Sequence, residues 1–197
     1  METMVLNLTD RKWREFKIGA LFDIELSKGD NQAKLLQEGN VPLVSAGSIN
    51  NGICKYISAG DGVSKNFSRN IITIDMFGKA FYQPATFYAV SHGRVNIMIP
   101  KGVFNKWHGL FIVTALEQGG KGKYSFANMC NQSRLQRSKI LLPVDNNGAP
   151  DYEFMERYIR TLTEHKRDEY RRFLNKQTNK SGCRVKNGRN SRLKILH

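Results

Sequence analysis

The sequence predicts an α+β protein, with one globular, β-rich mixed domain over residues 1–150 followed by a long C-terminal helix over residues 151–176. Three observations predict this fold class. Short apolar runs of strand length alternate with Gly, Asn and Ser between residues 13 and 119. An apolar stripe with a spacing of three and four residues follows Pro150-Asp151. A chain of 197 residues, 40% of them hydrophobic, is long enough for one packed core and an extension.

The elements of the β-rich domain follow from local patterns. Strands are expected at residues 14–18, 41–44, 71–74, 94–99 and 140–144. The loop at residues 45–52 contains Asn51-Gly52, which has the chemistry of a tight turn with positive φ. One helix is expected to follow Asn105 as its N-cap and to end before Gly119-Gly120, which supply a left-handed C-cap.

The long helix has acidic residues at its start and basic residues at its end, which suits the helix dipole. Its length predicts that part of its apolar stripe is covered by a second copy of the chain. The residues expected at that contact are Met155, Ile159, Leu162, Tyr170 and Phe173. The alternative is that the stripe folds back on the domain's own core. Residues 177–197 contain six basic residues and no acidic one, which predicts a flexible basic tail.

The net charge of +14 indicates an anionic partner. Residues 1–150 contain 18 basic and 11 acidic residues, and residues 151–197 contain 13 and 6, so each part carries a surplus of seven. The surplus therefore belongs to the folded domain as well as to the tail. A basic domain without membrane features favours nucleic acid as the partner.

Several functional classes lack their sequence signals. There is no run of 18 apolar residues and no export signal, so we expect no membrane contact and a cytoplasmic location. The three scattered cysteines are expected to be reduced thiols. The four histidines lie far from one another and from the cysteines, so we expect no metal site and no cofactor.

Catalytic motifs are also missing. A methyltransferase would show a Gly-rich cofactor loop and a Pro-Pro-aromatic tetrapeptide, and neither is present. Residues 119–123 resemble a phosphate loop but lack the hydroxyl residue after Lys123. Asp151 and Glu153 are better explained as helix-opening residues than as a nuclease pair. We therefore expect a protein without catalytic activity of its own.

Four loop groups combine basic residues with amides, hydroxyls and aromatics, which suits phosphate contact and base-edge recognition. The candidate DNA-binding residues are Ser48, Asn50, Asn51, Lys55, Lys65, Asn66, Arg69, Lys79, Lys121, Lys123, Gln132 and Arg134. Ser64, Tyr82, Gln83, Tyr124, Ser125, Asn128 and Asn131 accompany them in the same groups. An ordinary loop composition of Asn, Ser and Gly remains the alternative for each group.

Five blocks lie in order along the chain, at residues 13–24, 39–53, 78–83, 123–126 and 134–151. Together they resemble a known family, the target-recognition domains of type I restriction-modification specificity subunits, over about residues 13–175. The resemblance implies a domain that recognises one half of a split site in double-stranded DNA, followed by a spacer helix. It also implies a partner adenine-specific DNA methyltransferase subunit and a separate motor-nuclease subunit.

This chain departs from the family in having one recognition domain and one helix, where specificity subunits usually have two domains in one chain. It is thus a half-subunit that acts as a homodimer, a truncated product, or the recognition protein of a related type II system. Two other classes stay open on the residues alone. One is an RNA-binding or ribosome-associated basic protein, although most aromatics lie in apolar runs typical of a core. The other is an enzyme with an unrecognised site.

Overall fold

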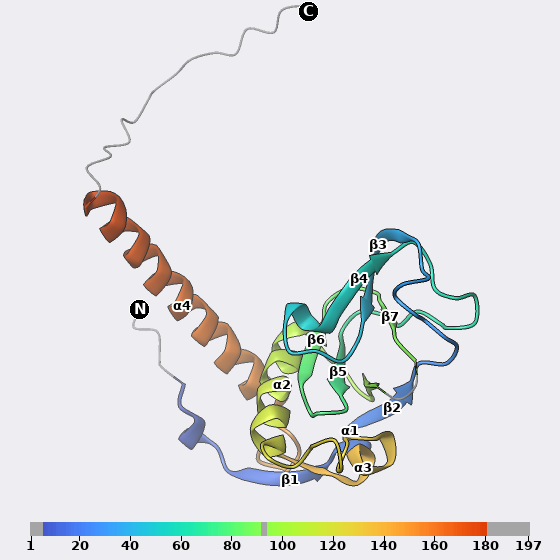
Figure 1. The fold of residues 1–197 in the computed structure, drawn as a ribbon. Helices are drawn as coiled ribbons and strands as arrows, with labels where there is room; N and C mark the ends of the chain where they lie inside the picture. The colour runs from blue at the N-terminus through green and yellow to red at the C-terminus, as the bar shows by residue number, and fades with distance from the viewer. Residues whose placement is uncertain (1–5, 92–93, 181–197) are drawn as a thin grey trace, which may run out of the picture. The chain divides into compact units, whose positions relative to one another are not determined.

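The computed structural model describes residues 6–91 and 94–180, with side chains described as far as residue 178 (Figure 1). The chain divides into a compact unit, Met1–Arg160, and a second unit, Thr161–His197. None of the helices in the described residues is long and apolar enough to cross a membrane. The predicted basic tail falls largely on residues 181–197, which lie outside the described residues.

Three sheets build the described part of the compact unit. The central sheet is antiparallel and has the order β2-β8-β5-β6, with β2 at Phe22–Leu26, β8 at Val95–Pro100, β5 at Ile71–Asp75 and β6 at Ala80–Gln83. A second sheet has the order β4-β3-β7, with β4 at Ile53–Ile57, β3 at Glu38–Val44 and β7 at Tyr88–Ala89. Strands β1 (Trp13–Lys17) and β9 (Lys139–Pro143) pair antiparallel and so join the two ends of the domain.

Both faces of the central sheet are covered, because β5 lies between two apolar clusters. Ile72 and Ile74 pack with residues of helix α2 (Lys106–Gly120) such as Ile112. The neighbouring Ile71 packs in a second cluster with Val44 and Phe87, which come from the β3 and β7 side. All five residues of β5 are buried as a result, which explains why Ile71, Ile72 and Ile74 do not follow the alternating pattern of a strand with one exposed face.

The expected strands at 14–18, 41–44, 71–74, 94–99 and 140–144 correspond to β1, β3, β5, β8 and β9. Strands β2, β4, β6 and β7, and the short helices α1 (Ile18–Leu21) and α3 (Gln132–Arg137), were not expected. The prediction for α2 is confirmed at its start, where Asn105 Oδ1 accepts hydrogen bonds from Trp107 N at 2.9 Å and His108 N at 3.2 Å. It is wrong at its end: both predicted capping glycines are helical, and the positive φ of 71° belongs to Gly122.

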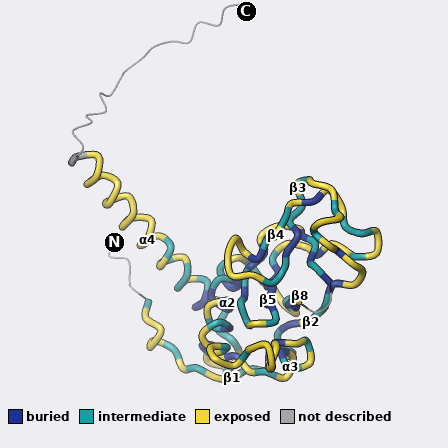
Figure 2. Tube along the Cα trace, in the orientation of Figure 1, coloured by how far each residue is buried: buried dark blue, intermediate teal, exposed yellow. Residues whose placement is uncertain are grey.

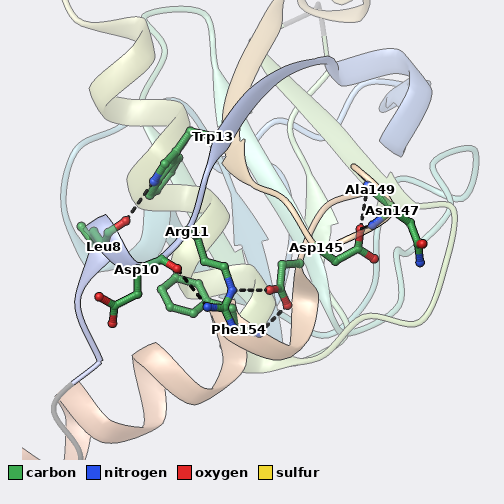
Figure 3. Close-up of polar contacts among 9 residues, drawn as sticks. Leu8, Asp10, Arg11, Trp13, Asp145, Asn147, Ala149 and Phe154 are labelled. Carbon is green, nitrogen blue, oxygen red and sulfur yellow. Dashed lines mark hydrogen bonds and ion pairs between the residues drawn. The ribbon is translucent and has the colours of Figure 1, made fainter.

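Helix α4 (Tyr152–Lys180) begins at a capped and anchored turn (Figure 3). Asp151 Oδ1 accepts a hydrogen bond from Phe154 N at 2.8 Å, and Asp151 Oδ2 accepts one from Arg11 Nε at 2.8 Å. The Arg11 guanidinium also lies 4.9 Å from the centre of the Phe154 ring. The helix-opening role expected for Asp151 is therefore confirmed. The helix extends past the expected end at residue 176.

The apolar stripe of α4 changes its environment along the helix (Figure 2). Met155 is fully buried in the core of the compact unit, and Ile159 packs against the same cluster. Met155 is therefore not available for contact with a second chain, and this part of the expected contact is corrected. In the second unit, the Leu162 and Phe173 side chains are 42% and 54% exposed, and Tyr170 is exposed as well.

Candidate nucleic-acid interface

A buried carboxylate at the end of β5 organises two of the predicted loop groups. Asp75 Oδ1 accepts hydrogen bonds from Phe77 N and Lys79 N, each at 2.9 Å. Its other oxygen accepts a hydrogen bond from Gly47 N at 3.3 Å. Asp75 therefore holds the β5–β6 turn and the loop at residues 45–52 together at one edge of the central sheet, the edge at which β5 ends and β6 begins.

The loop at residues 45–52 lies along the β5–β6 pair rather than projecting away from it. Its closing bonds run from Ser45 N to Gly52 O at 2.8 Å and from Gly52 N to Ile49 O at 2.9 Å. Gln83, buried on β6, donates from Nε2 to the Asn51 carbonyl at 3.0 Å. The predicted positive φ at Asn51-Gly52 is confirmed, with values of 52° and 71°.

This loop presents the first group of candidate residues to solvent. Ser48, Asn50 and Asn51 are exposed, and Asn50 also has a positive φ of 49°. Asn tolerates this conformation better than most residues, so the backbone geometry accounts for part of the Asn content. Gln83, which we grouped with the contact residues, instead supports the loop from below by bonding to Asn51 and to Thr73 Oγ1.

The loop at residues 121–131 joins the same edge through backbone contacts. Cys130 N donates to Met76 O at 2.8 Å, and buried Asn96 donates from Nδ2 to Cys130 O at 2.8 Å. The Tyr124 ring lies against Gly78, where a Cβ atom would approach the ring to 2.5 Å. The groups around residues 48–51, 79 and 121–131 are therefore brought together, although they are far apart in the sequence.

The remaining group, at residues 64–69, lies toward the other end of the β5–β6 pair. Asn70 N donates to Gln83 O at 2.9 Å, and the Tyr82 hydroxyl bonds to the Asn70 side chain. Asn66 and Arg69 are exposed. Lys65 lines an open hollow of about 820 Å³ together with Gln132, which comes from the group at 121–134.

Several candidate side chains have intramolecular partners. Lys55 Nζ donates to the carbonyls of Ala33 and Leu36 at 3.1 and 2.7 Å, and Gln132 Nε2 donates to Ile24 O at 2.6 Å. Lys65 pairs with Glu25 at 2.5 Å, and Lys79 pairs with Glu117 at 2.8 Å. Lys55 and Gln132 are only partly exposed and support neighbouring segments, whereas Lys121 and Lys123 are exposed.

Burial keeps two titratable groups near this edge in their neutral forms. Burial raises the pKa of the Cys130 thiol to about 11, and burial also raises the pKa of the Tyr124 hydroxyl. Both groups are therefore neutral near pH 7. Among the described residues, no group of three or more His, Cys, Asp or Glu side chains is placed to hold a metal ion.

Comparison with known proteins identifies the family. The family model of the type I restriction modification DNA specificity domain matches residues 10–170. The chain belongs to this family. The specificity subunit S.BcgI of a type II restriction enzyme from Heyndrickxia coagulans is 31% identical over 160 residues, which are 78% of this chain and 44% of that protein. The match thus covers less than half the length of that relative.

Solved structures agree with the fold of the specificity domain. The S subunit of a type I restriction-modification system from M. genitalium matches with a TM-score of 0.57 and 17% identity, over 87% of this chain and 44% of that one. The HsdS subunit from Thermoanaerobacter tengcongensis matches with a TM-score of 0.52 and 15% identity, over 85% and 40%. The α+β class with a long C-terminal helix is confirmed. The expectation of a recognition component rather than a catalyst agrees with the family, whose model describes a DNA specificity domain.

The specificity domain also exposes residues at this edge that the sequence analysis did not select. Phe77 and Phe126 come from the two joined turns, and their ring centres lie 5.8 Å apart. Arg94 is exposed, and its carbonyl accepts a hydrogen bond from Met76 N at 3.1 Å. The positions of the two phenylalanines in the sequence could have indicated that they are exposed. Phe77 precedes a turn glycine and Phe126 lies in a polar loop, and large apolar side chains are seldom buried in such segments.

Proposed function

We propose that this specificity domain recognises base sequence in double-stranded DNA through the loop at 45–52, the β5–β6 turn and the loop at 121–131. The observation that carries the proposal is the shared attachment of these three segments around Asp75 and Met76. Segments fixed to one another and to a sheet edge can hold several side chains in register with successive bases.

The side chains at this surface divide into two roles. Exposed Lys121 and Lys123 contact phosphates, which sets position and salt dependence without sequence preference. Ser48, Asn50 and Asn51 contact base edges, where an Asn amide can bond to adenine in two places. Lys55 and Gln132 act indirectly, by holding the neighbouring segments at Leu36 and Ile24 in place.

The first experiment measures binding to duplex DNA by fluorescence anisotropy at several salt concentrations. Contact with about six phosphates gives a log-log slope near −5. Lys121→Glu should weaken binding to all duplexes, whereas Asn51→Gly should change sequence preference while keeping the positive-φ turn. Lys106→Glu is the matched control, because Lys106 lies at the opposite end of α2 from Lys121. Binding that does not depend on salt, or that occurs only with single strands, contradicts the proposal.

We also propose that the chain has no chemistry of its own and directs an adenine-specific methyltransferase subunit, and through it a motor-nuclease subunit, to the target. The exposed stripe of α4, which includes Leu162, Tyr170 and Phe173, then pairs two copies of the chain. Burial of apolar surface contributes about 25 cal/mol per Å² to such a contact. The two identical recognition domains of such a dimer would recognise identical half-sites, so the target would be an interrupted palindrome.

The dimer is tested with the double variant Leu162→Asp and Phe173→Asp. Light scattering should show a fall in mass, and methylation by the reconstituted complex should be lost. The melting temperature of the compact unit should not change, because both residues lie in the second unit. Unchanged mass together with unchanged methylation would rule out pairing through this stripe. Methyl transfer by the isolated chain with S-adenosylmethionine would show that it is an enzyme.

A further inference from the structure

Two phenylalanine side chains project from the joined turns at the edge described above. Phe77, in the β5–β6 turn, is 43% exposed, and Phe126, in the 121–131 loop, is 79% exposed. Their rings contact each other at a tilt of 49°. Met129, from the same loop as Phe126, is exposed as well. The edge therefore has an apolar tip, which is costly to leave in water and marks a contact surface.

The tip is held by rigid backbone on both sides. Phe77 N is bonded to the buried Asp75 carboxylate, and the following Gly78 is pressed against the Tyr124 ring. On the other loop, Ser125 and Asn128 exchange backbone hydrogen bonds of 3.2 and 3.1 Å around Phe126. The Asn128 side chain closes this turn on Lys123 O at 2.6 Å. The aromatic pair is therefore presented in a fixed position rather than on a mobile loop.

The surroundings of the tip are basic. Arg134 donates to the Met129 carbonyl, Lys123 belongs to the Phe126 turn, and Arg94 borders the Phe77 turn. Of the carboxylates beside the β5–β6 turn, Asp75 is buried and bonded to three backbone N–H groups, and Glu117 is paired with Lys79 at 2.8 Å. An apolar tip enclosed by positive charge complements a stack of bases between two phosphate backbones better than it complements a neutral protein surface.

We propose that Phe77 and Phe126 form an aromatic wedge that inserts at one base step of the bound duplex and partly unstacks it. The wedge rests on the proposed DNA-recognition function and deepens it, because the target would be selected for a deformable step as well as for base-edge contacts. Pyrimidine–purine steps such as TA and CA open most easily, so we expect one at a fixed position in the target.

The test uses a short duplex containing a site that the wild-type chain, with its methyltransferase partner, selects from a random library. The adenine analogue 2-aminopurine is placed at each step in turn, because its fluorescence rises when the base unstacks. The wild-type complex should show a rise at one step. Phe126→Ala, alone or with Phe77→Ala, should abolish that rise and lower affinity about 10- to 100-fold, the usual range for loss of one base–aromatic contact.

Three controls separate the possible causes. The slope of log affinity against log salt should not change in Phe126→Ala, because no charge is removed. Phe126→Trp should keep both the signal and the affinity. Val103→Ala truncates another exposed apolar side chain, outside the turns that meet around Asp75, and should have no effect.

The outcomes that overturn the wedge differ from failure of the proposed function. Tight, salt-dependent binding with no 2-aminopurine signal at any step, unaffected by Phe126→Ala, refutes the wedge alone. Unchanged DNA affinity with weaker methyltransferase binding in Phe126→Ala shows that the tip contacts protein, and also refutes it. Failure of the wild-type chain to select any duplex refutes DNA recognition itself, and the wedge with it.

Discussion

The two stretches of α4 have similar amino-acid patterns and opposite environments. In Tyr152–Arg160, Phe154 and Met155 are buried against the β-rich core. From Thr161 onward, Tyr170, Phe173 and Leu174 repeat the spacing but are exposed. Periodicity therefore predicts which face of a helix is apolar, but it does not predict what covers that face.

The bonding of the two stretches differs in the same way. The first stretch is attached to distant segments: Asp151, directly before it, bonds to Arg11, and Glu156 accepts a hydrogen bond from Asn105 Nδ2 at 2.6 Å. The second stretch has local ion pairs one turn apart, such as Lys166–Glu169 at 2.7 Å. Exposed pairs of this kind contribute about 0.3–0.5 kcal/mol each. The first stretch depends on tertiary contacts, and the second depends on local helix stability and on whatever covers its stripe.

The largest difference is expected from a matched pair of truncations. Met155→Ala should lower the free energy of unfolding by about 2–5 kcal/mol, because it leaves a cavity in the core. Phe173→Ala should change it by less than about 0.5 kcal/mol, because an exposed side chain leaves no cavity. Urea denaturation followed by circular dichroism measures both. Similar losses for the two variants would show that the second stretch is also packed in the isolated chain.

Much of the fold could be predicted from the sequence because the strongest signals are local. Continuous apolar runs located β3, β5 and β9, and the Asn105 cap located α2. The strands that were missed depend on pairing partners: β4 is placed by β3, and β7 is a two-residue strand that exists only through its parallel contact with β3. Pairing between segments distant in sequence is not encoded in any short window.

The candidate site was predicted in composition more than in arrangement. Residue types identified the loops at 45–52 and 121–131, but nothing in the sequence showed that Asp75 and Met76 join them. Residue types also could not show that Lys55 and Gln132 would bond inward to carbonyls. A lysine or glutamine in a loop has the same signature whether it contacts a ligand or its own backbone, because the choice depends on tertiary geometry.

A smaller effect on stability is expected from the contact between Arg11 and Asp151 at the start of the first stretch. Arg11→Ala removes a partly buried ion pair with Asp151 and the contact with the Phe154 ring, so it should cost about 1–2 kcal/mol. Arg171→Ala, which removes an exposed pair with Asp168, should cost less than about 0.5 kcal/mol. Thermal denaturation of both variants checks this. If Arg171→Ala costs as much as Arg11→Ala, local pairs rather than the contact between Arg11 and Asp151 support the helix.

The smallest effect is expected from pH, through His108 on α2. Burial lowers the pKa of the buried His108 imidazole below its usual 6.5, against the opposing effect of Glu156, whose carboxylate lies 3.4 Å away and also pairs with Arg160. The unfolded chain therefore binds a proton first as pH falls through about 6.5, so acidification should lower stability there. The bond from Asn105 lowers the pKa of Glu156, so the contribution of the Glu156 carboxylate to stability is lost only at lower pH.

His108→Phe, which keeps a ring between Phe104 and Tyr152, should flatten the dependence of melting temperature on pH near 6.5. His165→Gln, on the exposed stretch beside Glu169, should leave the profile as it is in the wild type. A profile that keeps its slope in His108→Phe would mean that another group links the first stretch of α4 to pH.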